Sequence, residues 1–577
     1  MNYTTQPIQT TGQIELPAWR SRVLFVLLLA GLATLLVRAV YLQGINNDFL
    51  QQKGDARYGR VVELHAHRGM ITDRHGEPLA VSTPVESVWA SPADTEVTTR
   101  QIIQLASIVG LSPEEVKSKL KDTSREFVYL KRQLPPEQAA RVVKLGIPGV
   151  SLQREYRRYY PGGDVTSHLI GFTDVDDNGQ EGIELALQAQ LGGKAGSQQV
   201  IKDRRGFIVE DAGSMRAPKA GGDVALSIDS KIQSMAFREI KQAVERNHAK
   251  AGSIVVLDAR TGEVLALANW PSFNPNNRAK PSVGVLRNRS VTDLFEPGST
   301  MKPFTVAAAL EAGKVRPGTL INTGGGQFTI NGRTIHDTHP SSALTVSQVI
   351  QRSSNVGTAR IALGLSPEVF WRSLNESGLG SVTGCEFPGE AVGKLRDYKT
   401  WRPIEQATMS YGHGISVNLL QLARAYTVFA NNGELLPVTL LRQQVPSVGV
   451  KVFSDATAQS VRDMMEMVVR PGGTAPLAQI TGYRVAGKTG TAHKLENGKY
   501  IDKYVASFVG MAPASDPRLI VAVMINEPGG RDYYGGLVAA PVFSNVMGSS
   551  LRILNVPNDA PLDNVMMAPG EVIGEEV

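Results

Sequence analysis

A serine and a lysine that could share a proton stand three residues apart, at Ser299 and Lys302. Pro297 and Gly298 favour a turn just before them, and the apolar residues that follow predict a helix. Side chains three residues apart lie on one face of a helix, so the lysine amine would reach the serine hydroxyl. A hydroxyl becomes a good nucleophile when a neighbouring base takes its proton. The pair predicts covalent catalysis by Ser299, although Ser118 opens a second Ser-x-x-Lys match in the chain.

A second polar pair, Ser353 and Asn355, follows a predicted helix at 346–352. Ser353 could relay a proton, and the Asn355 amide could donate a hydrogen bond to a substrate. Serine and asparagine are also common helix caps, so the pair alone leaves both interpretations open.

The third element is a run of small and charged residues, Lys488-Thr489-Gly490-Thr491. Apolar residues before it predict a strand, and its glycine would let a substrate backbone approach the strand edge. Lys488 and the two threonine hydroxyls would hold a carboxylate. No Gly-x-x-x-x-Gly precedes the lysine, which excludes a phosphate-binding P-loop.

These three elements occur in a fixed order, 54 and then 135 residues apart. Ser-x-x-Lys, Ser-x-Asn and Lys-Thr-Gly in that order are the signature of the penicillin-binding proteins and serine β-lactamases. Upstream, the segments beginning at Arg68, Arg158 and Gly179 resemble the motifs of class B penicillin-binding proteins. The chain therefore resembles a class B penicillin-binding protein of the division-specific FtsI type over nearly its whole length.

The resemblance implies a D,D-transpeptidase, in which Ser299 attacks the D-Ala-D-Ala bond of a stem peptide and β-lactams acylate the same residue. Its oxyanion hole would be the backbone N–H groups of Ser299 and Thr491. The catalytic set would be Ser299, Lys302, Ser353, Asn355 and Lys488. Substrate binding would fall to Thr489, Gly490, Thr491, Tyr533 and Tyr534. His493 departs from the family pattern, which usually has Arg or Lys there, so altered affinity for carboxylate-bearing β-lactams is expected.

The resemblance also implies partners: an FtsW-type glycan polymerase and other division proteins in the membrane. No cofactor, metal or nucleic acid is expected. The pairs His65/His67 and His336/His339 lack a third ligand, and a net charge of +6 over 577 residues is a weak signal for nucleic acid. Two other functions stay open: hydrolysis, as a carboxypeptidase or β-lactamase, and a scaffold or β-lactam sensor without turnover.

An apolar segment at residues 23–42 is 20 residues long, about one bilayer span. Arg20 and Arg22 precede it, which predicts a cytoplasmic N-terminus and an external catalytic domain. A cleaved signal peptide would have a shorter apolar core and a small-x-small site. The sequence thus predicts a single-pass protein of the bacterial inner membrane, with its catalytic domain in the periplasm. The one cysteine, Cys385, is expected to be buried.

The remaining chain predicts an α+β fold. Strand pairs at 253–268 and 504–525 enclose a largely helical region, which suggests one antiparallel sheet covered by helices. Residues 224–228 also look like a strand, and a helix capped by Asp229 should follow. The predicted domains are a tail at 1–22, an anchor at 23–42, an elongated pedestal resembling a dimerisation domain at 43–222, a transpeptidase domain at 223–556 and a loose tail at 557–577.

Overall fold

A computed structural model describes residues 18–45, 59–202, 208–277, 283–496 and 498–565. Most of the predicted N-terminal tail and the last part of the predicted C-terminal tail lie outside them. The chain forms two compact units, each built from separate stretches. The smaller unit contains Met1–His65, Val85–Glu155 and Ala195–Pro218. The larger unit contains Ala66–Pro84, Tyr156–Lys194 and Lys219–Val577.

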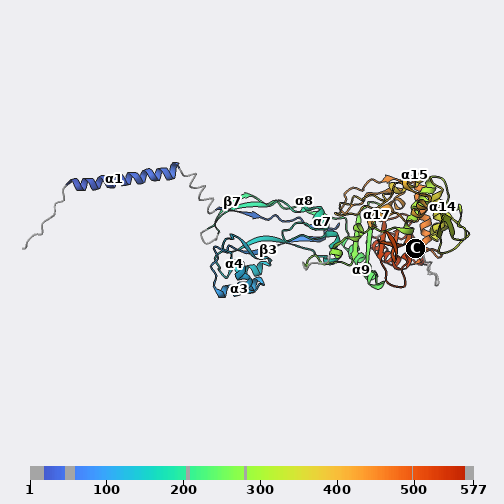
Figure 1. Cartoon of the computed structure of the whole chain (residues 1–577), viewed down its shortest axis with the longest axis horizontal. Helices are drawn as coiled ribbons and strands as arrows, with labels where there is room; N and C mark the ends of the chain where they lie inside the picture. The colour runs from blue at the N-terminus through green and yellow to red at the C-terminus, as the bar shows by residue number, and fades with distance from the viewer. Residues whose placement is uncertain (1–17, 46–58, 203–207, 278–282, 497, 566–577) are drawn as a thin grey trace, which may run out of the picture. The chain divides into compact units, whose positions relative to one another are not determined.

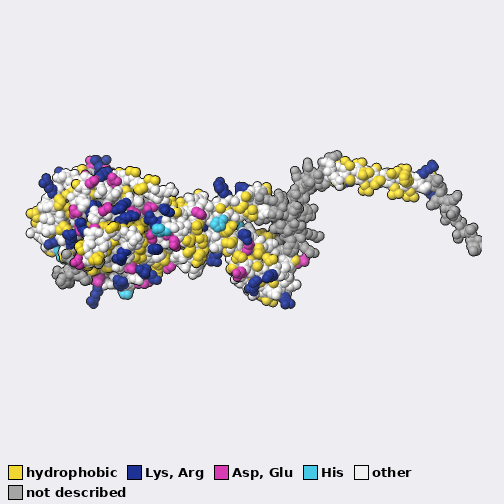
Figure 2. All heavy atoms as spheres, turned by 180° about the vertical axis from the view of Figure 1, so that it is seen from behind, with side chains coloured by type: hydrophobic (Ala, Val, Ile, Leu, Met, Phe, Trp, Pro, Cys, Tyr) yellow, Lys and Arg dark blue, Asp and Glu magenta, His cyan; other side chains and the backbone are white. Residues whose placement is uncertain are grey.

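The first described element is the long helix α1, Ala18–Val40, which continues into a π-helical turn at Tyr41–Ile45. The stretch Trp19–Gly44 has a mean hydropathy of 2.6 and is long enough to cross a membrane. Hydrophobic side chains cover α1 along its length (Figure 2). The predicted anchor at 23–42 lies within this stretch.

The smaller unit has a core of its own, made by helices packed on strands. Its helices are α3, Thr99–Val109; α4, Pro113–Leu120; and α5, Pro136–Val143. Its strands are β1, Gly59–Leu64; β4, Val128–Leu134; β6, Gly196–Lys202; and β7, Ile208–Arg216. Strands β1, β6 and β7 form an antiparallel sheet. The competing Ser118 match lies exposed on α4, as expected for a surface helix.

Strands β3, Pro78–Ala90, and β5, Val150–Tyr159, contribute residues to both units. The larger unit is organised around a five-stranded antiparallel sheet in the order β10-β9-β19-β18-β17. Its strands are β9, Ala251–Asp258; β10, Val264–Trp270; β17, Ala486–Glu496; β18, Lys499–Ala512; and β19, Leu519–Asn526. Every residue of β9 and β19 is buried, so both faces of the sheet are covered. The predicted sheet from two distant strand pairs is confirmed.

Helices of the larger unit surround this sheet (Figure 1). Those packed on the strands are α9, Ser230–Arg246; α17, Leu419–Ala425; α19, Asp455–Val469; and α21, Ala540–Ile553. The helical region between contains α12, Lys302–Glu311; α13, Val346–Gln351; α14, Asn355–Leu363; α15, Pro367–Glu376; α16, Pro403–Met409; and α18, Thr427–Ala430. Asp229 caps α9 by accepting hydrogen bonds from two backbone N–H groups, as predicted. Cys385 is buried, also as predicted.

Shorter pieces complete the larger unit. Its short strands are β2, Ile71–Thr72; β8, Val224–Ala225; β11, Leu320–Asn322; β12, Gln327–Ile330; β13, Arg333–His336; β14, Ala343–Thr345; β15, Glu434–Leu435; and β16, Val450–Lys451. Its one-turn helices are α6, Ser167–Ile170; α7, Gly182–Ala186; α8, Gln188–Leu191; α10, Val283–Leu286; α11, Arg289–Thr292; and α20, Gly535–Val538. The strand predicted at 224–228 was too long: β8 has two residues and runs parallel to β2. Ser227, just after β8, instead bonds to loop and strand carbonyls.

The three upstream motifs meet in one buried ion cluster. Arg68 and Arg158 both donate to the carboxylate of Glu184, each at 2.6 Å from guanidinium Nε to a carboxylate oxygen. All three residues are at most 3% exposed. Arg68 also donates to the backbone carbonyl of Asp177 and to the side chain of Gln188. These motifs, far apart in the sequence, therefore form one structural node.

The end of the described chain is more ordered than the predicted loose tail. Asp559 accepts a hydrogen bond from the Arg484 backbone at 2.7 Å. The Asn564 amide donates to the carbonyls of Ile480 and Tyr483. The prediction of a loose tail was wrong for these residues, because their polar side chains satisfy backbone groups next to β17 that no strand pairs with.

Candidate functional site

The predicted nucleophile lies in a 3₁₀ turn, Gly298–Met301, that runs directly into α12. Lys302 Nζ is 2.9 Å from Ser299 Oγ, so the predicted contact between the two side chains is present. The amine also lies 3.0 Å from Ser353 Oγ and 2.5 Å from the Ser353 carbonyl oxygen. Lys302 is fully buried and Ser299 is 5% exposed. The first two sequence elements therefore converge on one buried amine.

Ser353 has a left-handed backbone, with φ of 60°. Such a conformation strains a residue other than glycine by about 1–3 kcal/mol, and persists where its surroundings fix it. Here it ends the segment after α13 and turns the Ser353 hydroxyl toward Lys302. The capping role that the sequence left open belongs to the next residue: Ser354 caps α14 by accepting from Gly357 N at 2.8 Å.

A residue outside the predicted set, Asp337, holds this segment in place. One Asp337 carboxylate oxygen accepts from Ser354 Oγ at 2.5 Å, and the other accepts from Val356 N at 2.9 Å. The carbonyl of His336 accepts from the Asn355 amide at 3.4 Å. His336 ends strand β13, so the end of one hairpin contacts three successive residues around the Ser-x-Asn element.

The His336–His339 segment drew attention in the sequence only as an incomplete metal site. Among the described residues, no group of three His, Cys, Asp or Glu side chains could hold a metal ion. Asp337, inside that segment, is 9% exposed, and its carboxylate accepts the hydrogen bonds from Ser354 and Val356. No local sequence pattern singles out Asp337, because it lies nine residues before the predicted helix at 346–352 and 17 residues before Ser354.

Strand β17 supplies the third element at the edge of the sheet, as predicted. Lys488 is fully buried, and its Nζ lies 3.0 Å from Thr489 Oγ1. The nucleophile turn packs against this strand: an added β-carbon at Gly490 would lie 2.8 Å from the Pro297 carbonyl oxygen, and one at Gly298 would lie 3.3 Å from the Thr491 carbonyl oxygen. Bare glycines on both sides thus let the turn and the strand approach closely.

The predicted aromatic pair lies beside the same strand. Gly535, which follows it, donates its N–H to Thr491 Oγ1 at 3.1 Å. Tyr533 stacks on Tyr504 of β18 with ring centroids 4.1 Å apart, and its hydroxyl donates to that of Tyr534 at 3.1 Å. The His493 ring also contacts the Tyr504 ring, with ring centroids 4.7 Å apart. The Nδ1–H group of His493 donates to the Ile501 carbonyl oxygen at 3.1 Å.

A second cluster, also missed in the sequence, surrounds Glu296, three residues before Ser299. The Glu296 carboxylate accepts from Gly414 N at 2.8 Å and from the Tyr500 hydroxyl at 3.0 Å. Burial raises the pKa of Glu296, against a lowering by these two hydrogen bonds. The His413 ring also contacts the Tyr500 ring, with ring centroids 6.0 Å apart. Burial lowers the pKa of His413 to about 4, helped by the charges of Lys302 and His493, so its imidazole is neutral at pH 7.

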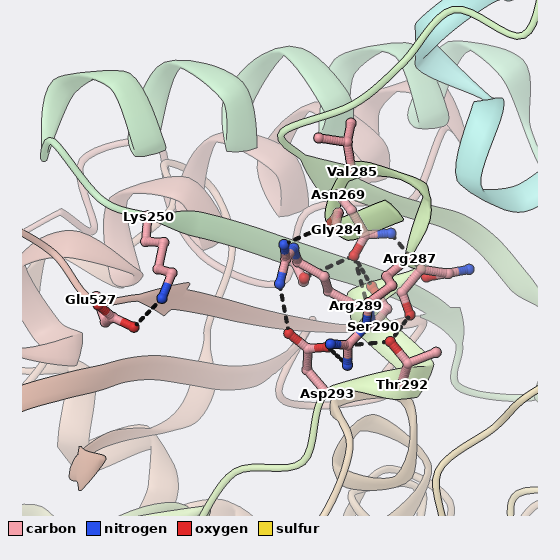
Figure 3. Close-up of polar contacts among 12 residues, drawn as sticks. Lys250, Asn269, Gly284, Val285, Arg287, Arg289, Ser290, Thr292, Asp293 and Glu527 are labelled. Atoms are coloured by element: carbon pink, nitrogen blue, oxygen red, sulfur yellow. Dashed lines mark hydrogen bonds and ion pairs between the residues drawn. The ribbon is translucent and has the colours of Figure 1, made fainter. Parts of the chain in front are cut away.

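The chain that leads into the nucleophile is anchored by a buried amide network (Figure 3). Asn269 Oδ1, on β10, accepts from Ser290 N and Ser290 Oγ at 3.0 and 2.9 Å. Nearby, Arg287 and Arg289 both pair with the carboxylate of Asp293. A segment fixed to the sheet in this way sets the starting point of the turn that holds Ser299.

Together, these contacts can support acyl transfer. A hydroxyl with a buried amine at 2.9 Å can lose its proton to that amine when the amine is neutral. The Ser353 hydroxyl, 3.0 Å from the same amine, can pass the proton onward. The adjoining edge strand offers backbone groups to an extended peptide.

A Ser-x-x-Lys helix packed beside the edge strand of an antiparallel sheet defines a penicillin-recognising fold. The family model described as "Penicillin binding protein transpeptidase domain" matches residues 252–548. A second, described as "Penicillin-binding Protein dimerisation domain", matches residues 63–226. The chain belongs to the penicillin-binding proteins, and its resemblance to the class B, FtsI-type members is confirmed.

Relatives are similar over almost the whole chain. The sequence is 43% identical over 562 residues to the probable peptidoglycan D,D-transpeptidase PenA of Neisseria meningitidis, covering 96% of this chain and 95% of that protein. It is 42% identical over 564 residues to the peptidoglycan D,D-transpeptidase FtsI of Escherichia coli, with the same coverage. Among solved structures, the transpeptidase domain of penicillin-binding protein 3 from Burkholderia pseudomallei is 51% identical, covers 58% of this chain and 98% of its own, and has a TM-score of 0.54.

Proposed function

We propose that this protein cross-links peptidoglycan through an acyl-enzyme on Ser299. The observation that carries the proposal is the contact of the buried Lys302 amine with the hydroxyls of both Ser299 and Ser353. The family match and the transpeptidases among the relatives support the same reaction.

In the first half-reaction, Ser299 Oγ attacks the carbonyl carbon between the two D-Ala residues of a stem peptide, and its proton passes to neutral Lys302. Backbone N–H groups of Ser299 and Thr491 stabilise the oxyanion. The peptide C–N bond then breaks, and the departing D-Ala amine takes up a proton through Lys302 and Ser353. Asn355 and Lys488 orient the donor peptide, and Thr489, Gly490, Thr491, Tyr533 and Tyr534 line its path.

In the second half-reaction, an amine of a neighbouring strand attacks the ester carbon, forming the new amide as the Ser299 C–O bond breaks. The attacking nitrogen loses a proton to Lys302, and Ser299 recovers it. β-Lactams acylate the same hydroxyl as their ring opens. The resulting ester persists because water attacks it slowly.

The long apolar helix indicates a single-pass membrane anchor. We propose a cytoplasmic N-terminus, because Arg20 and Arg22 flank the helix start, and hence a periplasmic catalytic domain. Similarity to FtsI supports a role in septal wall synthesis beside an FtsW-type glycan polymerase and other division proteins. The domain boundaries at 43–222 and 223–556 stay part of this proposal.

The test is covalent labelling of the full-length protein by a fluorescent penicillin. Wild type should take up one label per chain and hold it through a chase with unlabelled penicillin. Ser299→Ala should take up none while melting at the wild-type temperature. Label retained by Ser299→Ala would contradict the assigned nucleophile, and rapid loss of label from wild type would favour a hydrolase instead.

A further inference from the structure

The hairpin of β17 and β18 runs past the body of the sheet. Strand β19 pairs with β18 from Val505 to Ala512, whereas β17 and β18 continue to pair as far as Glu496 and Lys499. The β17–β18 register shifts between His493 and Lys494, where the extension begins. Such a bulge bends a strand pair. A two-stranded extension has little stability of its own, so other contacts must set its position.

The Tyr500 side chain makes such a contact. Its hydroxyl donates to both carboxylate oxygens of Glu296, at 3.2 and 3.0 Å, although the two residues are 204 positions apart. The Tyr500 ring also contacts His413. Tyr500 is 52% exposed and Glu296 is half-buried, so the contact lies where solvent meets the site.

The Glu296 carboxylate also holds the glycine-rich loop that contacts the nucleophile turn. It accepts from Gly414 N at 2.8 Å. Two residues earlier, Gly412 has φ of 93°, and an added β-carbon there would lie 2.2 Å from the Gly298 carbonyl oxygen. The loop therefore touches the backbone of the residue before Ser299, and a shift of the loop would shift the nucleophile.

We propose that Glu296 is a positioning residue for Ser299: with Tyr500 and Gly414 it forms a rim latch that holds the hairpin extension and the glycine-rich loop against the nucleophile turn. The proposal rests on the proposed role of Ser299 as nucleophile. Hydrogen bonds to a carboxylate are stronger than those between neutral groups, which suits one side chain to hold two separate segments. His413, neutral and packed between Tyr411 and Tyr500, supplies the apolar support for this contact.

The test measures acylation of the full-length protein in detergent by a fluorescent penicillin, in stopped flow. Penicillin concentration is varied to separate the binding constant from the acylation step. Tyr500→Phe keeps the ring but removes the hydroxyl, and Glu296→Ala removes both bonds. Each should slow the acylation step about five-fold with little change in binding, because misplacing a nucleophile weakens the chemical step. Melting temperatures should stay at the wild-type value, since the Tyr500 contact is exposed.

A double variant and two controls make the test specific. Glu296→Ala/Tyr500→Phe should be no slower than Glu296→Ala, because both changes break one latch. Glu296→Gln keeps an acceptor oxygen and should recover most of the rate. Tyr129→Phe is the matched control: it removes a hydroxyl that donates to the Glu155 carboxylate at 3.1 Å in the smaller unit, and should acylate normally.

Wild-type rates in Tyr500→Phe, effects that multiply in the double variant, or a parallel fall in melting temperature would overturn the latch. Failure of the proposed nucleophile has a different signature. In that case Ser299→Ala would still be labelled at the endpoint, whatever the rates of the latch variants.

Discussion

Two buried charged clusters of the larger unit differ in what their charges meet. Around Glu184, two guanidinium groups, from Arg68 and Arg158, contact one carboxylate at 2.6 Å each. Around Lys302, one amine contacts two serine hydroxyls and a backbone carbonyl. The charged side chains Arg68, Arg158, Glu184 and Lys302 are all at most 3% exposed.

The difference separates a structural cluster from a reactive one. In the Glu184 cluster one buried carboxylate pairs with two guanidinium groups, and removing one partner of such a buried ion pair strongly destabilises a fold. Hydroxyl partners can both give and accept protons, so the Lys302 cluster can change its protonation during a reaction. The first cluster should therefore govern folding stability, and the second should govern rate.

Replacement of Lys302 should give the largest effect on rate. Lys302→Met removes the proposed base while nearly preserving side-chain volume, and should slow penicillin acylation by about 10³-fold. Stopped-flow labelling measures the rate, and circular dichroism melting confirms the fold. Acylation within ten-fold of wild type would place the base elsewhere.

Loss of the charge at Glu184 should give the largest effect on stability. Glu184→Gln leaves two buried guanidinium groups without a carboxylate, which should lower the free energy of unfolding by about 3–5 kcal/mol. Chemical denaturation checks this value. The folded fraction should still be acylated at the wild-type rate. A loss of acylation rate without loss of stability would show that the Glu184 cluster acts in the reaction and not in folding stability.

Replacement of Asp337 should give an intermediate effect on rate, because its carboxylate holds the segment next to Ser353 in place. Asp337→Asn weakens the bonds to Ser354 and Val356 and should slow acylation about ten-fold, with penicillin binding little changed. The matched control is Asp174→Asn, because that carboxylate accepts from two backbone N–H groups of its own turn. Equal acylation rates in both variants would show that Asp337 does not position the segment next to Ser353.

Glu527 should give the smallest effect. Burial would raise its pKa, but hydrogen bonds from Lys494, Lys503 and Lys250 outweigh this and hold the pKa at about 2 (Figure 3 shows the Lys250 contact). The pKa of Glu527 is therefore depressed below the value of an unfolded glutamate, which is about 4.3. The stabilisation is present at neutral pH and is lost as the pH falls from about 4.3 toward the folded-state pKa of about 2.

Glu527→Gln should therefore destabilise the protein by about 1 kcal/mol at pH 7, a value reduced by the exposure of Lys250 and Lys503. Unfolding curves at pH 7 and pH 3 should show a smaller difference between the two pH values than in wild type. An unchanged pH dependence would show that the three lysines do not stabilise this carboxylate.

Local sequence patterns predicted the pieces of the site that depend on short-range geometry. Three-residue spacing on a helical turn brings Lys302 to Ser299, and the apolar run before Lys488 places it on a strand. Apolar runs in two distant strand pairs also predicted the sheet. Periodicity is a poor guide to the length of short strands, which is why 224–228 was overextended.

The sequence by itself determined the family and predicted the nucleophile and its lysine, because short motifs with a fixed order depend on chemistry that tolerates few alternatives. Only the tertiary structure revealed Asp337, Glu296 and Tyr500 beside them. Their contacts join segments 17 to 204 residues apart, and a single carboxylate or tyrosine carries no local pattern that names its partner. The same holds for Arg68, Arg158 and Glu184: their motifs were visible in the sequence, but the ion cluster exists only because folding removes all three from water at one point.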